Sequence, residues 1–254
     1  MQYNFIPPHQ DLQHYISHFW EGIWDSGMNT PHTGHIIIAN SLVEITFAFK
    51  SNAPHAELLF TTVQGQTNHP RQHLVPGFYH LFGVAIYAYA IPALFGFSPP
   101  EMRNEYLSLD TFLAAGARVL TEKIALASST QARVQILSDF FKARVVQPQQ
   151  TDQRMLAALN NIKKAGGNIN ITALAKTAYL SPKQFNRRFQ AFTGFNPKLY
   201  TRITRLESAL ASRPDHACFT SLAHEKGYYD QAHFINEFKL LTGYSPSAFW
   251  KLGE

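Results

Sequence analysis

The feature that most constrains the fold of this chain is a repeat between residues 170 and 250, where one pattern of residues occurs twice. The aromatic, glycine and proline residues of the first copy return at an offset of 49, as Phe185 and Phe234, Phe189 and Phe238, Gly194 and Gly243, and Pro197 and Pro246. The preceding Leu174 and Leu222 are 48 residues apart, so the second copy has one additional residue in its turn. A repeat of this length indicates two similar supersecondary units.

Each copy predicts a helix, a tight turn and a second helix. In the first copy, Asn170 is the expected N-cap of the first helix, and Ser181 with Gln184 forms a capping box that opens the second. In the second copy, Gly227 supplies the turn and Asp230 is the expected N-cap. This order of elements is a helix-turn-helix, expected at residues 170–194 and again at 218–243.

The second helix of each copy has a buried face and an exposed face. In the first copy Phe185, Phe189 and Phe192 recur at i, i+4 and i+7, and polar side chains lie about 200° around the helix from them. Such polar groups can recognise base edges, although for an isolated helix an ordinary solvated surface is the more frequent explanation. Because two such faces occur in duplicated units, recognition of bases becomes the favoured explanation. The candidate base-reading residues are Lys183, Asn186, Arg187 and Gln190 in the first copy and Gln231, Ala232 and Asn236 in the second.

A helix predicted over residues 198–212 joins the two copies. It would span roughly 20 Å at 1.5 Å per residue. This length suits two reading helices held about one DNA turn, ~34 Å, apart in successive major grooves. The candidate phosphate contacts are Arg188, Lys198, Arg202, Arg205 and Lys239. For Arg205, a structural ion pair with Glu207 or Glu225 is an equally weighted alternative.

Charge is distributed unevenly along the chain. Residues 1–150 contain 8 Lys and Arg against 10 Asp and Glu, and residues 151–254 contain 14 against 7. The net charges of −2 and +7 account for the total of +5. A basic C-terminal part predicts a polyanionic partner, here double-stranded DNA.

The first half of the chain predicts an α+β fold with a small antiparallel barrel or sandwich, of which we expect the β-barrel. Segments 34–50, 58–63 and 79–87 are rich in β-branched and aromatic residues and are broken by Gly, Pro and Asn. Two amphipathic helices are expected between residues 109 and 146. The predicted organisation is a β-rich sensor domain at 1–108, a helical and candidate dimerisation segment at 109–147, a linker at 148–153, and a C-terminal all-α DNA-binding domain at 154–254.

Several classes of function are disfavoured by the composition. The single Cys218 excludes an internal disulfide, and the absence of an apolar run of ~20 residues or a leader pattern predicts a cytoplasmic protein without membrane contact. His69, His73 and His80 suggest a metal site, but the first two lie where a loop is expected, so their spacing does not align them. No metal, other cofactor or enzymatic activity is expected, because no ligand set, nucleophile triad or phosphate loop is present.

The duplicated pattern resembles the AraC/XylS family of bacterial transcription regulators. The matching residues are Leu174, Ala175, Ser181, Pro182, Phe185, Arg188, Phe189, Gly194 and Pro197, and then Leu222, Ala223, residues 227–231, Phe234, Phe238, Lys239, Gly243, Ser245 and Pro246. By this resemblance Lys183, Asn186 and Arg187 match base-reading positions of the first motif, and Gln231, Ala232 and Asn236 match those of the second. Many members have arginine where this chain has Asn236, which predicts a weaker second reader.

The resemblance also implies the rest of the expected function. It implies a cupin-like N-terminal domain that senses a small-molecule effector, dimerises, or does both. It implies an activator or repressor of transcription, with RNA polymerase and a second copy of the chain as further candidate partners. Two alternatives stay open: a cupin-like binding protein or enzyme with an incidental basic domain, and a non-sensing nucleoid protein.

Overall fold

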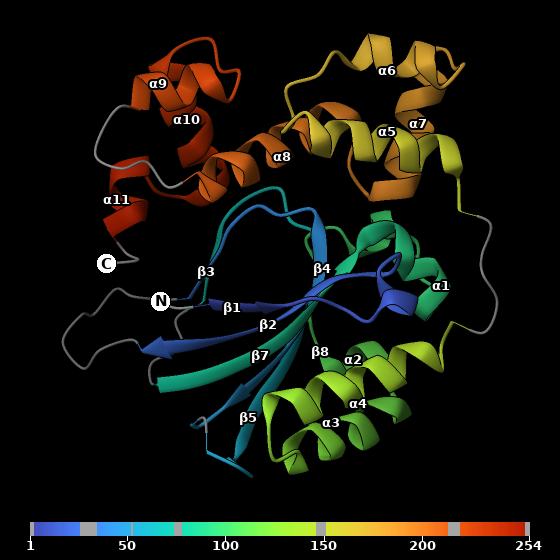
Figure 1. Cartoon of the computed structure of the whole chain (residues 1–254), viewed down its shortest axis with the longest axis vertical. Helices are drawn as coiled ribbons and strands as arrows, with labels where there is room; N and C mark the ends of the chain where they lie inside the picture. Colours follow the sequence, from blue (N-terminus) through green and yellow to red (C-terminus); the bar gives the residue numbers. More distant parts are fainter. Residues whose placement is uncertain are drawn as a thin grey trace. The chain divides into compact units, whose positions relative to one another are not determined.

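The computed structural model describes residues 3–25, 35–51, 53–73, 78–145, 151–212 and 219–251, which form two compact units (Figure 1). The first unit draws on residues 1–35, 42–66 and 73–149, and the second on residues 36–41, 67–72 and 150–254. Cys218 and the first half of the predicted linker at 148–153 lie outside the described residues. No helix in the described part of the chain is long and apolar enough to cross a membrane.

The first unit is built on a six-stranded antiparallel sheet. In hydrogen-bonded order its strands are β1 (Tyr3–Ile6), β2 (Ile16–Asp25), β7 (Phe78–Tyr87), β4 (Leu42–Phe49), β5 (Leu58–Gln64) and β8 (Tyr106–Ser108). Strands β1 and β8 are the two edges, and no pairing between them occurs among the described residues. The expected N-terminal antiparallel sheet followed by C-terminal helices is confirmed, but its closure into a barrel is not.

One face of this sheet forms the main apolar core, because side chains alternate along a strand. Val43, Ile45, Phe47 and Phe49 alternate along β4 and are fully buried, and Phe82 pairs with Phe47 from the neighbouring strand β7. The helices that contribute to this core are α1 (Ile91–Phe95), α2 (Leu109–Leu113), α3 (Ala115–Leu126) and α4 (Thr130–Lys142). Short 3-10 helices complete the unit: η1 (Gln10–Leu12), η2 (Ala88–Ala90) and η3 (Pro99–Met102).

The strands predicted at 34–50, 58–63 and 79–87 are confirmed, and the helical prediction after residue 109 needs one correction. The first of the two expected helices is interrupted at Ala114, whose φ of 48° lies outside the helical region and separates α2 from α3. Strands β1, β2, β6 and β8 are not predicted by the sequence patterns.

The second unit is a set of helices arranged along one long helix. Its helices are α5 (Gln153–Lys164), α6 (Ile171–Thr177), α7 (Pro182–Thr193), α8 (Pro197–Ala211), α9 (Phe219–Glu225), α10 (Gln231–Thr242) and α11 (Pro246–Lys251). In Figure 1, α6 and α7 lie at one end of α8, and α9 and α10 lie at its other end. Both copies therefore contain the two helices that the repeat predicts, and α8 is the helix expected between them.

Two short segments from the first half of the sequence fold with these helices. Strand β3 (His35–Ile37) pairs with β6 (Arg71–His73), and residues 36–41 and 67–72 belong to the second compact unit. Asn40 and Thr67 exchange two backbone hydrogen bonds, of 3.0 and 3.1 Å, that tie the segments together. The sequence patterns assign both segments to the sensor domain at 1–108. Contacts between residues that are distant in the sequence produce no local pattern from which this placement could be predicted.

Candidate nucleic-acid interface

Local hydrogen bonds fix the first helix-turn-helix in the way the sequence predicts. The Asn170 side chain accepts from the backbone N–H of Ala173 at 3.0 Å and caps α6. Ser181 accepts from the N–H of Gln184 at 3.3 Å, and the Gln184 side chain accepts from the N–H of Ser181 at 3.1 Å. This reciprocal capping box opens α7 and fixes the angle at which the helix leaves its turn.

Helix α7 presents its predicted reading face to solvent. Phe185 and Phe189 are buried, with their rings 5.7 Å apart. Lys183, Asn186 and Arg187 are exposed on the other side, and Gln190 is half-buried. An exposed face that carries an amine, an amide and a guanidinium offers donors and acceptors suited to base edges in a major groove.

The second helix-turn-helix uses the same chemistry with one difference in its turn. Asp230 accepts from the N–H of His233 at 2.7 Å and caps α10. Gly227 has a φ of 74°, and a Cβ added there would lie 2.4 Å from the side chain of Asn168. Only glycine fits both the backbone conformation and the available space. The following Tyr228 is buried against Phe234, with ring centroids 5.1 Å apart.

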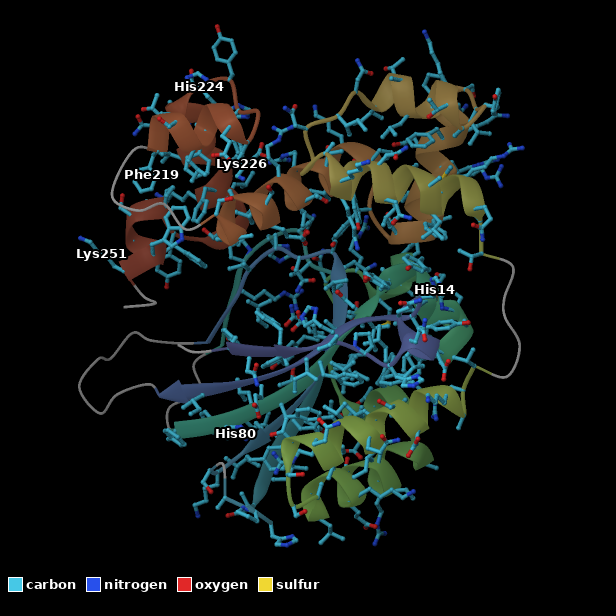
Figure 2. The ribbon with its side chains drawn as sticks, in the orientation of Figure 1. His14, His80, Phe219, His224, Lys226 and Lys251 are labelled. Atoms are coloured by element: carbon cyan, nitrogen blue, oxygen red, sulfur yellow. The ribbon has the colours of Figure 1, made fainter. Side chains whose placement is uncertain are left out.

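Helix α10 carries a smaller and uncharged reading face. Gln231, Ala232 and Asn236 are all exposed. The Gln231 side chain accepts a hydrogen bond of 2.7 Å from the hydroxyl of Thr220, which orients its amide. Phe219 of the preceding helix α9, labelled in Figure 2, stacks on Trp250 with ring centroids 5.7 Å apart, so the helix that supports the reading helix is itself held by aromatic packing.

Each turn exposes a tyrosine that the sequence patterns do not predict to be exposed. Tyr179 is 88% exposed and has a φ of 55°, and Tyr229 is 87% exposed. Both turns begin with the same backbone pattern, since the N–H of Leu180 donates to Ala175 and the N–H of Tyr228 donates to Ala223. Tyr229 is therefore the additional residue of the second copy.

The predicted phosphate contacts divide into exposed and engaged side chains. Lys198 and Lys239 are exposed. The Arg188 guanidinium contacts the Asp152 carboxylate at 2.8 and 3.2 Å. The Nε of Arg202 lies 3.0 Å from an Oε of Glu237, a carboxylate that is 8% exposed.

Arg205 is directed into the second unit. Its guanidinium lies 5.1 Å from the centroid of the Tyr228 ring, and it donates to the carbonyl of Gly167 at 3.4 Å. Its Nε is buried. Burial and the nearby Glu237 raise the pKa of the Tyr228 hydroxyl above its usual value. These contacts are of the structural kind, but Arg205 makes them with Tyr228 and Gly167 and not with the predicted partners Glu207 or Glu225.

The first unit contains a partly buried polar cluster between its sheet and α4. Glu21 accepts from the hydroxyl of Thr130 at 2.5 Å and from the Asn4 amide at 3.0 Å. His80, labelled in Figure 2, lies 3.7 Å from the same carboxylate, and Arg133 stacks on the Phe49 ring at 3.8 Å. Burial, with a smaller effect of Arg133, lowers the pKa of His80. No group of three or more potential metal ligands occurs in the described residues.

Comparisons with known families match the two halves of the chain separately. Residues 4–108 match a domain of unknown function (DUF6597), and residues 174–251 match a helix-turn-helix domain. No curated protein matches the chain in sequence.

Solved structures of ToxT from Vibrio cholerae share the fold. One, at 9% identity and a TM-score of 0.50, covers 92% of this chain and 98% of ToxT. Another, with a TM-score of 0.51 and the same identity and coverage, is bound to (E)-4-(8-methylnaphthalen-1-yl)but-3-enoic acid.

Proposed function

Because the chain belongs to the AraC/XylS family of transcription regulators, we propose that it recognises a bipartite DNA site with α7 and α10 in successive major grooves. The observation that supports this proposal is the pair of capped reading helices at opposite ends of α8, each with its polar face exposed. Helix α8 has 15 residues, and its length of roughly 20 Å is compatible with two reading helices about one turn of DNA, ~34 Å, apart.

The two helices would read DNA by different chemistry. In α7, Arg187 is placed to donate a bidentate pair of hydrogen bonds to guanine, with Asn186 suited to adenine and Lys183 to guanine or phosphate. In α10, the amides of Gln231 and Asn236 are suited to adenine, and Ala232 can contact a thymine methyl. The α7 half-site should therefore be recognised more strongly than the α10 half-site.

The exposed basic residues supply the sequence-independent part of the binding. Lys198 and Lys239 are exposed and are assigned to phosphates. Arg188 could exchange its Asp152 partner for a phosphate, since both side chains are accessible. Arg202 and Arg205 hold Glu237 and Tyr228 in place, so they contribute to the positive field around the unit more than to direct contacts.

Selection of preferred sites from random DNA tests the proposal. The wild-type protein should enrich a site of two half-sites about one helical turn apart. Arg187→Ala should lose the sequence preference in one half-site only, with a cost of about 1–3 kcal/mol at that base. Arg154→Ala, an exposed arginine on α5, is the matched control and should keep the full preference. Equal loss of affinity for all DNA in Arg187→Ala would show a backbone contact and refute the assignment.

We also propose that the first unit responds to a small-molecule effector. Two groups of its sheet support this: burial raises the pKa of Glu44 to about 7, and the buried Nε1 of Trp20 lacks a hydrogen-bond partner among the described residues. A ToxT structure contains an apolar carboxylic acid, which makes such acids the first class to screen. A shift in the melting temperature of the first unit that is lost in Trp20→Phe would support the proposal, and no shift with any tested acid would exclude this class.

Dimerisation through residues 109–147 is the remaining part of the proposed function. Helix α3 exposes Val119 and Leu126 seven residues apart on one face, with 55% and 70% of these side chains accessible. A second copy of α3 would cover both. Analytical ultracentrifugation should give the mass of a dimer for the wild type and of a monomer for Leu126→Glu. A monomeric wild type at working concentration would exclude dimerisation.

A further inference from the structure

The DNA-binding unit includes residues that lie far from it in sequence. Segments 36–41 and 67–72 cluster with residues 150–254, and Ile37, Ala39 and Ser41 are buried there. The chain continues directly from Ser41 into β4, a central strand of the sheet in the first unit. These segments, which we call the docking hairpin, are thus covalent continuations of the first unit that fold as part of the second.

The docking hairpin contacts the last turn of the second reading helix. The N–H of Ala39 donates to the carbonyl of Leu241 at 2.9 Å. Carbonyls in the last turn of a helix have no partner within the helix, so this bond satisfies one of them. Pro70 lies beside the C-cap of the same helix, because a Cβ added to Gly243 would be 3.4 Å from its ring.

The docking hairpin also contacts the helix that separates the two readers. The Ser41 hydroxyl donates to an Oε of Glu207 on α8 at 3.1 Å, and the Ser41 backbone N–H also bonds this carboxylate. Lys163 of α5 lies close enough to act electrostatically on the same group. Burial raises the pKa of Glu207 and lowers that of Lys163, which places the contact in a poorly hydrated environment.

These contacts leave the reading surface open. Gln231, Ala232 and Asn236 lie in the first two turns of α10, whereas Leu241 and Gly243 lie at its opposite end. A hairpin docked at that end does not cover the reading residues. It joins α10 to α8, and α8 carries α7 at its other end.

We propose that the docking hairpin is a positioning element of the DNA-binding unit, with Ser41 and Glu207 as its principal side-chain contact. It fixes α10 relative to α8 and thereby sets the orientation of the second reader when the first is bound. The docking hairpin should therefore strengthen binding to a site with both half-sites. It should not affect binding by α7 alone, because α7 lies at the other end of α8. The inference rests on the proposed bipartite DNA recognition.

The test compares two DNA duplexes in the full-length protein. One is the bipartite site selected by the wild type, and the other keeps the α7 half-site and carries scrambled sequence in the α10 half. Ser41→Ala should bind the bipartite duplex about 5-fold more weakly, as expected for loss of one buried hydrogen bond. Its affinity for the half-scrambled duplex should stay within about 2-fold of the wild type. Glu207→Ala, which removes both Ser41 contacts, should show a larger loss of the same kind.

Ser138→Ala is the matched control. Ser138 is 5% exposed, as against 4% for Ser41, and its hydroxyl bonds within α4 of the first unit. This variant should bind both duplexes like the wild type. If Ser41→Ala loses equal affinity for both duplexes, the contact is merely structural and the inference is overturned.

Two further outcomes separate the inference from the proposed function. A wild type that binds both duplexes equally would refute bipartite reading, whereas a wild type that prefers the bipartite duplex together with an unaffected Ser41→Ala would refute the positioning role alone. Hydrogen exchange in the free protein gives an independent measurement. Amides of the last turn of α10 should exchange several-fold faster in Ser41→Ala than in Ser138→Ala, and unchanged exchange would also contradict the inference.

Discussion

The two helix-turn-helix copies share a backbone plan and differ in how their charged residues are used. Around α7, Lys183 and Arg187 remain exposed. Near the second copy, Arg202 contacts a buried carboxylate of α10, and Arg205 stacks on Tyr228 in its turn. In the second copy, arginine side chains stabilise the packing of the helices. In the first copy, the basic side chains of α7 stay exposed and are accessible to DNA. Sequence duplication alone therefore does not predict equal function.

The difference extends to the turns. In the first turn the left-handed position is occupied by exposed Tyr179, and in the second by Gly227, which closely approaches Asn168. The second turn is packed against its neighbours, whereas the first is open to solvent. A packed turn tolerates fewer residues, so the backbone of the turn is constrained more tightly in the copy for which we propose the weaker recognition of DNA.

The largest expected effect comes from Arg202→Ala. This change leaves the Glu237 carboxylate, which is 8% exposed, beside the His233 ring at 3.5 Å but without its arginine, and breaking such a buried ion pair costs about 3 kcal/mol in the free energy of unfolding. Arg188→Ala breaks a more accessible pair in the first copy and should cost at most ~1 kcal/mol. Urea denaturation of both variants checks the comparison, which fails if the two costs are equal.

A smaller effect is expected at Gly227. Alanine there must adopt a φ of 74° and accommodate a Cβ 2.4 Å from Asn168, so we expect a loss of about 2 kcal/mol. Gly96→Ala is the control, because Gly96 has a similar φ of 79° and no atom within 4 Å of an added Cβ. It should cost only ~1 kcal/mol, the backbone part of the effect. If the two variants lose equal stability in thermal or urea unfolding, the neighbours of Gly227 add no steric cost beyond that of the backbone conformation.

Much of each copy could be predicted from sequence because its determinants are local. The caps at Asn170, Ser181 and Asp230 act within three residues, and the phenylalanine spacing follows from helical periodicity. The contacts that could not be predicted from the sequence join residues that are far apart in the chain. Arg202 and Glu237 are 35 residues apart, and Ser41 and Glu207 are 166 apart.

The first unit shows the same limit. Strands β4, β5 and β7 follow from runs of β-branched and aromatic residues. The short edge strand β1 carries no such run, and the break between α2 and α3 falls at Ala114, a residue type with a high intrinsic preference for helix. Both depend on neighbours across the sheet or beneath the helices. The base-reading assignments remain predictions, since exposure and placement are compatible with them without testing them.

The smallest expected effect concerns the two exposed tyrosines and has opposite signs in the two copies. A tyrosine at a φ of 55° occupies a conformation that costs about 1 kcal/mol for a residue with a Cβ, and glycine does not have this cost. Tyr179→Gly should therefore raise the free energy of unfolding by about 0.5–1 kcal/mol. Tyr229 is equally exposed but is not among the residues with positive φ, so Tyr229→Gly should lower stability by a similar amount through the greater entropy of the unfolded chain.

Chemical denaturation of the two variants under identical conditions measures this pair directly. Opposite signs would show that the first copy retains a strained residue that its fold does not need. Retention of a strained, fully accessible aromatic next to the reading helix is then a reason to measure DNA affinity in Tyr179→Gly, because strain often persists where a side chain has a function. A stability gain without any change in DNA affinity would remove this residue from the interface, and destabilisation by Tyr179→Gly would contradict the strain itself.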